Sequence, residues 1–242
     1  MLRPISIPGL FITATDTEVG KTVVAGAIAD WFRRRRFRVG VCKPVASGCK
    51  HVREGLVSED AEFLAHCADA DAPLDIICPQ RFAEPLAPAI AAERAGRPLD
   101  WEAIDRALRE ISSQSDVMIV EGVGGVMVPM DGKFLVRDVI QWLGLPAVVV
   151  ARPGLGTINH TLLTLTALRE AKIPIAGVVI NRYPADNAGI AEETNLRLIE
   201  KWAKAPLLTV VPDEAIKPPM LPGGIVAAMQ RVEWSGLASL RK

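Results

Sequence analysis

A Gly-Lys-Thr triplet at residues 20–22 is the feature of this chain that most directly indicates chemistry. It follows an apolar run and opens a stretch with the spacing of an amphipathic helix. Backbone N–H groups at a helix start bind phosphate, the Lys21 ammonium neutralises it, and the Thr22 hydroxyl can reach Mg²⁺. The usual loop has a glycine five residues before Gly20, where this chain has Thr15. The sequence therefore predicts a variant phosphate-binding loop.

Other polar residues stand where a nucleotide site would use them. Glu121 ends an apolar run and precedes glycines, which favours a metal-binding carboxylate over an exposed acid. Lys43 ends another run, and it is either solvated or stabilises phosphate charge. Asp60 follows the helix N-cap Ser58, so it either complements the helix dipole or binds Mg²⁺, and spacing leaves both open. His160, in the first turn of a predicted helix, is expected to be neutral and structural.

Short apolar runs alternate with amphipathic stretches along the chain, which predicts buried parallel strands between helices. The predicted strands are Gly9–Thr13, Arg38–Lys43, Asp75–Cys78, Asp116–Glu121, Ala147–Ala151, Ile175–Asn181 and Leu207–Val211. The predicted helices are Lys21–Arg36, Glu59–Cys67, Leu99–Ser113, Leu135–Leu143, Thr157–Ala171 and Ala188–Ala203. We expect one doubly wound α/β domain over residues 1–242, with a mainly parallel sheet flanked by helices. Its core spans about 9–212, and 213–242 form an irregular tail with one short helix near 225–232.

The segments that follow the predicted strands are small, polar or charged. Ligands bind at the carboxyl ends of the strands in an open parallel sheet. Residues 43–48, 121–125, 154–160 and Asn181 should therefore converge with the loop at 15–22 on one rim. This convergence is more specific than any single motif.

Composition narrows the classes of partner. The chain has 28 Lys and Arg against 28 Asp and Glu, which argues against nucleic acid or an anionic membrane as the main partner. The basic run Arg33–Arg36 falls at the end of a predicted helix, where it complements the dipole. The four cysteines lack zinc-site spacing and are expected in the core. Without a signal-peptide or membrane-spanning pattern, a reducing cytoplasm is expected.

The rim segments together resemble the dethiobiotin synthetase family, ATP-dependent ring-closing enzymes of biotin biosynthesis. They read TDTEVGKT at 15–22, KPVASG at 43–48, EGVGG at 121–125 and LGTINH at 155–160, in the family's order. EPLAP at 84–88 resembles its proline-bearing segment. The resemblance spans about Phe11 to Pro212 and implies a P-loop NTPase fold. It also implies a homodimer in which the neighbouring subunit completes the substrate site.

The resemblance implies a reaction of ATP, CO₂ and 7,8-diaminononanoate with Mg²⁺. One amine takes up CO₂ as a carbamate, the carbamate attacks the γ-phosphate, and the second amine closes the ring and expels phosphate. Lys21 and Lys43 are the implied catalytic residues. The implied ATP-binding residues are Thr17, Glu18, Val19, Gly20, Lys21, Thr22 and Asn181, which would read adenine. The implied substrate-binding residues are Ser47, Gly122, Gly124, Gly154, Gly156 and Asn159, and the implied Mg²⁺ ligands are Thr22, Asp60 and Glu121.

The chain departs from the family pattern at three places. Ala14 replaces a common glycine, and Ala89 replaces a frequent histidine. Tyr183, the only tyrosine, lies several residues before the position where some members place a substrate-binding tyrosine. Contacts to the substrate tail are therefore less well defined than contacts to ATP.

Two other classes share features with this chain. A partitioning or localisation ATPase of the deviant P-loop type carries a second lysine early in the loop, at the position of Asp16 here. It also often has a C-terminal membrane helix, which the proline-broken tail of this chain does not suggest. A cobyrinate-type amide ligase is usually joined to a glutaminase domain, for which this chain is too short.

Overall fold

Six strands form the central sheet of the structure, a computed structural model that describes residues 1–53 and 55–240. They are β1 (Gly9–Ala14), β2 (Val39–Cys42), β7 (Val117–Glu121), β8 (Ala147–Ala151), β9 (Ile175–Tyr183) and β10 (Leu207–Pro212). Their order is β10-β9-β8-β1-β7-β2, and every neighbouring pair is parallel. Every residue of β1, β2, β7 and β8 is buried, which explains their continuous apolar runs. The prediction of a mainly parallel sheet is confirmed.

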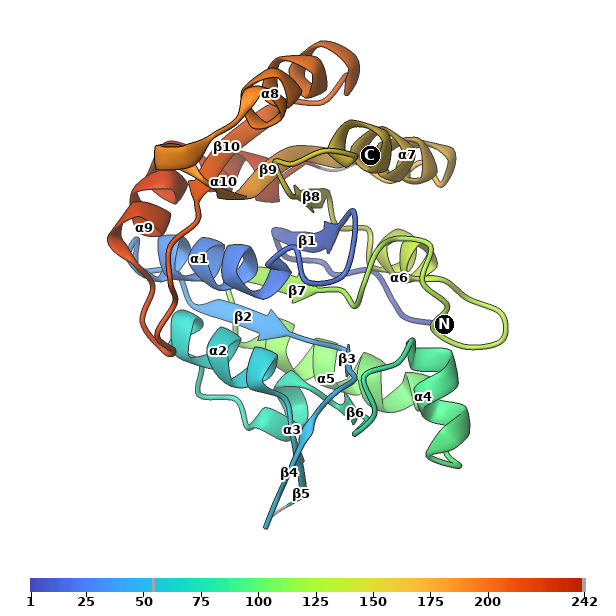
Figure 1. The fold of residues 1–242 in the computed structure, drawn as a ribbon. Coiled ribbons are helices and arrows are strands. Elements are labelled where there is room, and N and C mark those ends of the chain that lie inside the picture. Colours follow the sequence, from blue (N-terminus) through green and yellow to red (C-terminus); the bar gives the residue numbers. More distant parts are fainter. Residues whose placement is uncertain (54, 241–242) are drawn as a thin grey trace.

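Two layers of helices cover the sheet (Figure 1). One layer contains α1 (Lys21–Arg33), α2 (Glu59–Ala68), α9 (Gly223–Gln230) and α10 (Trp234–Ala238). The other contains α4 (Pro88–Arg94), α5 (Trp101–Ser113), α6 (Val136–Leu143), α7 (Thr157–Glu170) and α8 (Ile190–Trp202). In α1, the predicted apolar stripe of Val24, Ala27, Ile28 and Trp31 is buried against the sheet. The six predicted helices before the tail are all present, with ends that shift by a few residues.

One predicted strand is wrong. Residues 74–77 form the single-turn helix α3 (Leu74–Ile77), directly after Pro73. A four-residue apolar run fits either a strand or a helical turn, and here β2 closes the edge of the sheet. The Ile77 carbonyl accepts the backbone N–H of Lys43 at 2.8 Å, so this turn fixes the chain where β2 ends.

The segment after Pro212 is more ordered than a tail with one helix. Helix α9 overlaps the predicted short helix, and α10 follows it. Trp234 is fully buried, and its indole N–H donates to the Met229 carbonyl at 3.0 Å. Both helices contribute to the core beside α1, because Ile225, Met229 and Trp234 complete that layer.

Short strands outside the main sheet were not predicted. Strand β3 (Val45–Ala46) pairs in parallel with β6 (Gln80–Arg81), and β4 (Lys50–Val52) pairs in antiparallel with β5 (Gly55–Val57). The β4–β5 hairpin projects from the body of the molecule (Figure 1). The 3₁₀ turn Ala185–Asn187 lies between β9 and α8.

Candidate nucleotide site at the carboxyl ends of the strands

The P-loop, residues 15–22, joins β1 to α1. Gly20 is the N-cap of α1 in a left-handed conformation, with φ 87°, and neither a capping side chain nor an acidic residue occupies the first turn. The first N–H groups of the helix are therefore available to an anion. A Cβ atom at Gly20 would lie 2.1 Å from Asn181 Nδ2, so the close approach of these two segments requires glycine.

Asn181, at the end of β9, holds the P-loop in place. Its Nδ2 donates to the Val19 carbonyl at 2.8 Å, and the residue is buried. The Val19 side chain is buried in the core, so it anchors the loop from the other side. For an adenine contact, this leaves the Asn181 Oδ1 atom and the second Nδ2 hydrogen, which the bond to Val19 does not use.

Lys43 lies between two carboxylates. Its Nζ donates to Asp60 Oδ2 and to Glu121 Oε1, at 2.7 Å each. The Thr22 hydroxyl donates to the same Glu121 oxygen at 2.9 Å. Glu121 is 1% exposed and Lys43 is 3% exposed, so the contact between these two residues is shielded from water, whereas Asp60 is partly exposed. Lys21 lies close to it and donates weakly to the Asp16 carbonyl at 3.5 Å.

The two lysines have different electrostatic surroundings. Burial alone would lower the pKa of Lys43, but Glu121 and Asp60 outweigh it and raise that pKa above its usual value. Burial would raise the pKa of Asp60, but Lys43, Thr22 and Lys21 together lower it below its usual value. For Lys21, burial lowers the pKa and exceeds the attraction of Glu121, while Lys43 adds repulsion. Lys43 is thus kept charged by its partners, whereas Lys21 forms no ion pair with a carboxylate of residues 1–53 and 55–240.

The donor atoms beside the P-loop fit a magnesium ion. Glu121 Oε2 is buried and has no hydrogen-bond partner within residues 1–53 and 55–240. The Thr22 hydroxyl, Asp60 and Glu121 offer oxygen donors, which hard cations such as Mg²⁺ prefer. Within the same residues, no group of three or more His, Cys, Asp or Glu side chains is placed to hold a metal. One or two carboxylates together with phosphate oxygens are the usual Mg²⁺ environment in such sites.

A cavity of about 500 Å³ opens above this network. Ten of the residues predicted for the site line it: Thr17, Glu18, Gly20, Lys21, Thr22, Lys43, Ser47, Asp60, Glu121 and Gly124. Val23, Val123 and Arg182 also line it, without having been predicted. The other predicted residues, Val19, Gly122, Asn181, Gly154, Gly156 and Asn159, do not line it. Gly122 has a packing role, because its Cβ would lie 2.8 Å from the Phe11 ring.

The loop before α7 is a separate rim of the site. Gly156 is the N-cap of α7 with φ 92°, Gly154 lies two residues before it, and Asn159 lies in the first turn of the helix. Asn195 of α8 anchors this loop, since its Nδ2 donates to the carbonyls of Pro153 at 2.8 Å and Gly154 at 3.2 Å. Asn195 was not predicted, because nothing in its local pattern distinguishes it from an ordinary helix residue.

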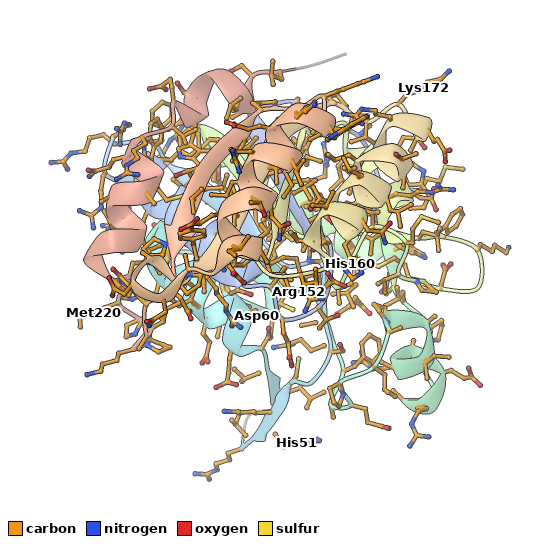
Figure 2. All side chains as sticks on the ribbon, turned by 45° about the horizontal axis from the view of Figure 1, so that its top comes forward. His51, Asp60, Arg152, His160, Lys172 and Met220 are labelled. Atoms are coloured by element: carbon orange, nitrogen blue, oxygen red, sulfur yellow. The ribbon has the colours of Figure 1, made fainter. Side chains whose placement is uncertain are left out.

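Asp16 connects the P-loop with the loop before α7. Its Oδ2 lies 2.9 Å from His160 Nδ1 and 3.4 Å from the Arg152 guanidinium (both residues are labelled in Figure 2). Burial would raise the pKa of Asp16, but the hydrogen bond with His160 and the nearby Arg152 guanidinium help to lower it. His160 thus has a specific partner, which the sequence did not indicate.

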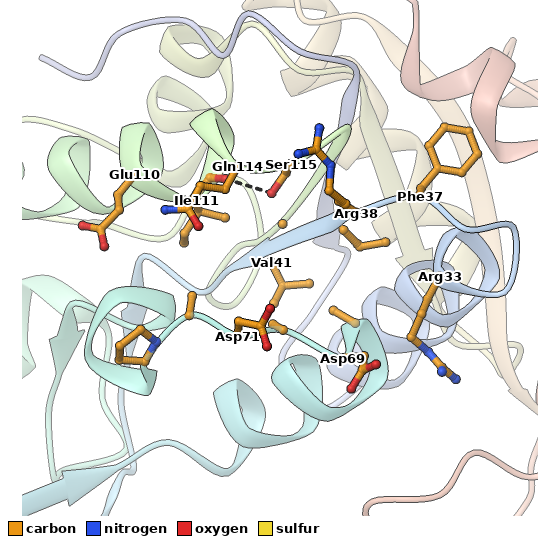
Figure 3. Close-up of a pocket in the computed structure, with 16 residues that line it drawn as sticks. Arg33, Phe37, Arg38, Val41, Asp69, Asp71, Glu110, Ile111, Gln114 and Ser115 are labelled. Carbon is orange, nitrogen blue, oxygen red and sulfur yellow. Dashed lines mark hydrogen bonds between the residues drawn. The ribbon is translucent and has the colours of Figure 1, made fainter.

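A second hollow, of about 350 Å³, lies at the opposite ends of the strands (Figure 3). Residues at the start of β2 and at the end of α5 line it, and Ser115 closes one side by donating to the Ile111 carbonyl at 2.8 Å. Its two arginines are already paired, Arg33 with Asp30 and Arg38 with Asp116. Ligands of open parallel sheets bind at the carboxyl ends, so the cavity beside the P-loop is the candidate site.

All four cysteines, Cys42, Cys49, Cys67 and Cys78, are buried and free of disulfides, as the sequence predicted for core residues. Burial raises the pKa of the Cys67 and Cys78 thiols to about 12. Within the described ranges, no helix is both long and apolar enough to cross a membrane.

Comparison with known proteins finds close relatives in sequence. A family model described as an AAA domain matches residues 8–217. The ATP-dependent dethiobiotin synthetase BioD of Thermodesulfovibrio yellowstonii is 41% identical over 212 residues, which cover 84% of this chain and 88% of that protein. The protein of the same name from Bacillus cereus is 42% identical over 204 residues, which cover 84% of this chain and 83% of its own length.

Solved structures match the fold at lower sequence identity. The cell division ATPase MinD of Pyrococcus furiosus has a TM-score of 0.53 and 16% identity, with 96% of this chain and 97% of that chain covered. The MinD cell division protein of Aquifex aeolicus has a TM-score of 0.53 and 14% identity, with 86% and 82% covered. These likenesses concern the fold alone, and they agree with the predicted P-loop NTPase architecture.

Proposed function

The chain belongs to the family of ATP-dependent dethiobiotin synthetases, and we propose that the cavity beside its P-loop is where that reaction takes place. The protein is therefore an ATP-dependent ligase that forms carbon–nitrogen bonds. The observation that carries the proposal for the site is the meeting of Lys21, Lys43 and Glu121 at one cavity, although they lie far apart in sequence. A site for anionic intermediates requires this concentration of charge.

ATP is the first substrate to place. The N–H groups of the P-loop and of the first turn of α1 bind its phosphates, and Lys21 contacts the transferring γ-phosphate. Thr17, Glu18, Val19 and Gly20 form the backbone of this cradle. Asn181 Oδ1 accepts from the adenine amino group, while its Nδ2 remains on Val19.

Each intermediate of the proposed reaction is an anion. One amine of 7,8-diaminononanoate adds to CO₂ and loses a proton, which gives a carbamate. A carbamate oxygen attacks the γ-phosphorus, the bond to the β-phosphate oxygen breaks, and ADP leaves. The second amine then attacks the carbamoyl carbon, phosphate leaves and a proton is lost as the ring closes. Lys43 stabilises the carbamate and the transferring phosphoryl group, and no protein nucleophile is needed.

Thr22, Asp60 and Glu121 are the residues that would hold Mg²⁺ with the phosphates. When bound, the ion supplies neutralisation of phosphate charge. The unpartnered Glu121 Oε2 atom supports this assignment.

The diamine substrate lies on the other side of the γ-phosphate. Ser47 and Gly124 line the cavity and face the amines. Gly122, next to Glu121, remains in the proposed substrate-binding set, although it is buried against Phe11. Gly154, Gly156 and Asn159 present the start of α7 to the substrate carboxylate, because a helix N-terminus favours an anion.

The active unit is a homodimer in which a second copy covers α7 and α8. These two helices pack together, and four side chains on them and on the loop before α7 are more than half exposed: Leu155 in the loop, Leu163 on α7, and Ile190 and Trp202 on α8. This apolar face continues from the loop at 154–159, so a second copy there would complete the substrate site. Leu163→Glu together with Trp202→Glu should convert a dimer to a monomer in sedimentation velocity, whereas Ile90→Glu, a change at an exposed residue of α4, should not. A monomeric wild type would refute the dimer.

The proposed compartment is a reducing cytoplasm, which the four unpaired buried cysteines support. Neither nucleic acid nor a membrane is a proposed partner, in keeping with the balanced charge of 28 basic and 28 acidic residues.

Product analysis tests the function. Phosphate release and dethiobiotin formation should both require ATP, 7,8-diaminononanoate and bicarbonate together. Lys43→Ala should lower turnover by about 10²-fold or more, because a charge on the transferring group is lost. Lys50→Ala, at the exposed Lys50–Glu59 pair, is the matched control. ATP hydrolysis that ignores the diamine and responds to DNA or lipid vesicles would indicate a partitioning ATPase instead.

A further inference from the structure

Strand β9 carries an irregularity just where it reaches the site. Val210 of β10 pairs with Ile180, but Pro212 pairs with Tyr183, so β9 has one more residue than β10 across this step. Arg182 lies in this bulge in the left-handed region, with φ 57°. Left-handed backbone is uncommon for arginine, and bulges beside active sites often redirect side chains.

Beside the bulge, the neighbouring side chains of Asn181 and Arg182 lie in different surroundings. Asn181 is buried and bonded to the P-loop. Arg182 is exposed and lines the 500 Å³ cavity together with Lys21 and Lys43. Arg182 Nε lies 3.9 Å from the point where a Cβ atom at Gly20 would be, which places the guanidinium group over the P-loop.

Arg182 differs from the other two cations of the cavity. Lys43 is bonded to two carboxylates, and Lys21 is bonded to the Asp16 carbonyl. Across residues 1–53 and 55–240, the Arg182 side chain has no hydrogen-bond or ion-pair partner. The carboxylates that line the cavity balance its cations in number, three against three, so a bound polyphosphate brings unmatched negative charge.

We propose that Arg182 is a nucleotide-binding residue that pairs with the phosphate chain of ATP. A guanidinium group presents several donors in a planar fork, which suits phosphate oxygens. The inference rests on the proposed function, because it assumes that the cavity binds ATP. It adds a cation from β9 to a cradle that is otherwise built by the loop after β1 and by Lys43.

Calorimetric titration with ADP tests this role directly. Arg182→Gly removes the guanidinium and keeps a residue that tolerates the left-handed backbone. Its affinity for ADP should fall about tenfold, which corresponds to about 1.4 kcal/mol. The ADP affinity of Arg182→Lys, which keeps the charge but loses the planar arrangement of donors, should fall less. Arg197→Ala removes another exposed arginine, on α8, and should leave the affinity unchanged.

Inorganic tripolyphosphate, competed against ADP, identifies the contacted group. Arg182→Gly should weaken its binding by a similar factor. Loss of ADP affinity with unchanged tripolyphosphate affinity would assign the contact to the base and overturn the proposal. Unchanged ADP affinity in Arg182→Gly, beside a wild type that binds ADP, would also overturn it while leaving the proposed function intact. Failure of the wild type to bind ADP would refute the nucleotide site as a whole.

Discussion

Replacing Lys43 by methionine should destabilise the protein, because the negative charges of Asp60 and Glu121 then lose their cationic partner. Lys43→Met keeps the length of the side chain and removes both contacts of 2.7 Å to Asp60 and Glu121. Loss of one partner of a buried ion pair costs about 3–5 kcal/mol. The Asp60 side chain is 45% exposed and can be hydrated, whereas the Glu121 side chain is fully buried. Because Thr22 still donates to Glu121, we expect a cost near the lower end, about 3 kcal/mol.

Thermal unfolding without nucleotide measures this cost. For a chain of this size, about 3 kcal/mol corresponds to a fall in Tm of roughly 6–12 °C. Lys50→Met is the control, because Lys50 and Glu59 are each 65% exposed, and such surface pairs contribute about 0–1 kcal/mol. Lys43→Met combined with Glu121→Gln removes both charges and should recover most of the loss.

Magnesium alone should rescue the single variant. In Lys43→Met, Asp60 and Glu121 lack the ammonium that engages them, so added Mg²⁺ should raise Tm more than it does for the wild type. The reasoning is refuted if Lys43→Met melts within about 2 °C of the wild type, since that is below one kcal/mol for this size. A Tm for the double variant as low as that of the single variant would equally contradict it.

Three further predictions concern other parts of the structure. Urea unfolding should show that Gly20→Ala destabilises the protein by about 2–4 kcal/mol. The alanine would have to adopt a left-handed backbone conformation, and its Cβ would displace the buried Asn181 side chain. Gly132→Ala, which meets no atom within 4 Å, should be nearly neutral, and equal costs would be contrary to this account. Asp16→Asn and His160→Ala should show a coupling energy of about 0.5–1.5 kcal/mol in a double-mutant cycle, whereas simple additivity would mean no interaction. Hydrogen bonds from Arg38 lower the pKa of Asp116 to about 2, so its stabilising contribution is present above the ordinary aspartate value and is lost as pH falls towards 2. An NMR titration should give that pKa and its rise in Arg38→Gln, and an ordinary pKa in the wild type would contradict the pairing.

The parts of the site that lie on strand ends were predictable from the sequence. Continuous apolar runs indicate parallel strands, and the carboxyl ends of parallel strands meet at one edge. The convergence of Lys43, Glu121 and the P-loop follows from that rule. The short run at 75–78 shows its limit, because four apolar residues do not separate a strand from a helical turn.

The contacts that fix these residues could not be predicted in the same way. Lys43 meets Asp60 and Glu121 across 17 and 78 residues of sequence, and spacing alone left Asp60 undecided between two roles. Arg182 reaches the cavity because β9 bulges against β10, and the bulge depends on the register between two strands. Asn195 similarly acts on a loop 41 residues away. Each of these roles is a property of tertiary packing, which local patterns do not encode.

Under the proposed function, the network around Lys43 must rearrange when ATP binds. Glu121 Oε1 already accepts from both Thr22 and Lys43, whereas Oε2 accepts from no described residue. Lys43 and Thr22 both donate to Glu121 in the free protein. Mg²⁺ would need the Glu121 and Thr22 oxygens, and phosphate would need the Lys43 ammonium, so these hydrogen bonds would have to be exchanged. The carboxylates then keep Lys43 charged and positioned before ATP binds, and the phosphates take over as its partners afterwards. In the free protein, Glu121 and Asp60 thus offset part of the repulsion between Lys21 and Lys43.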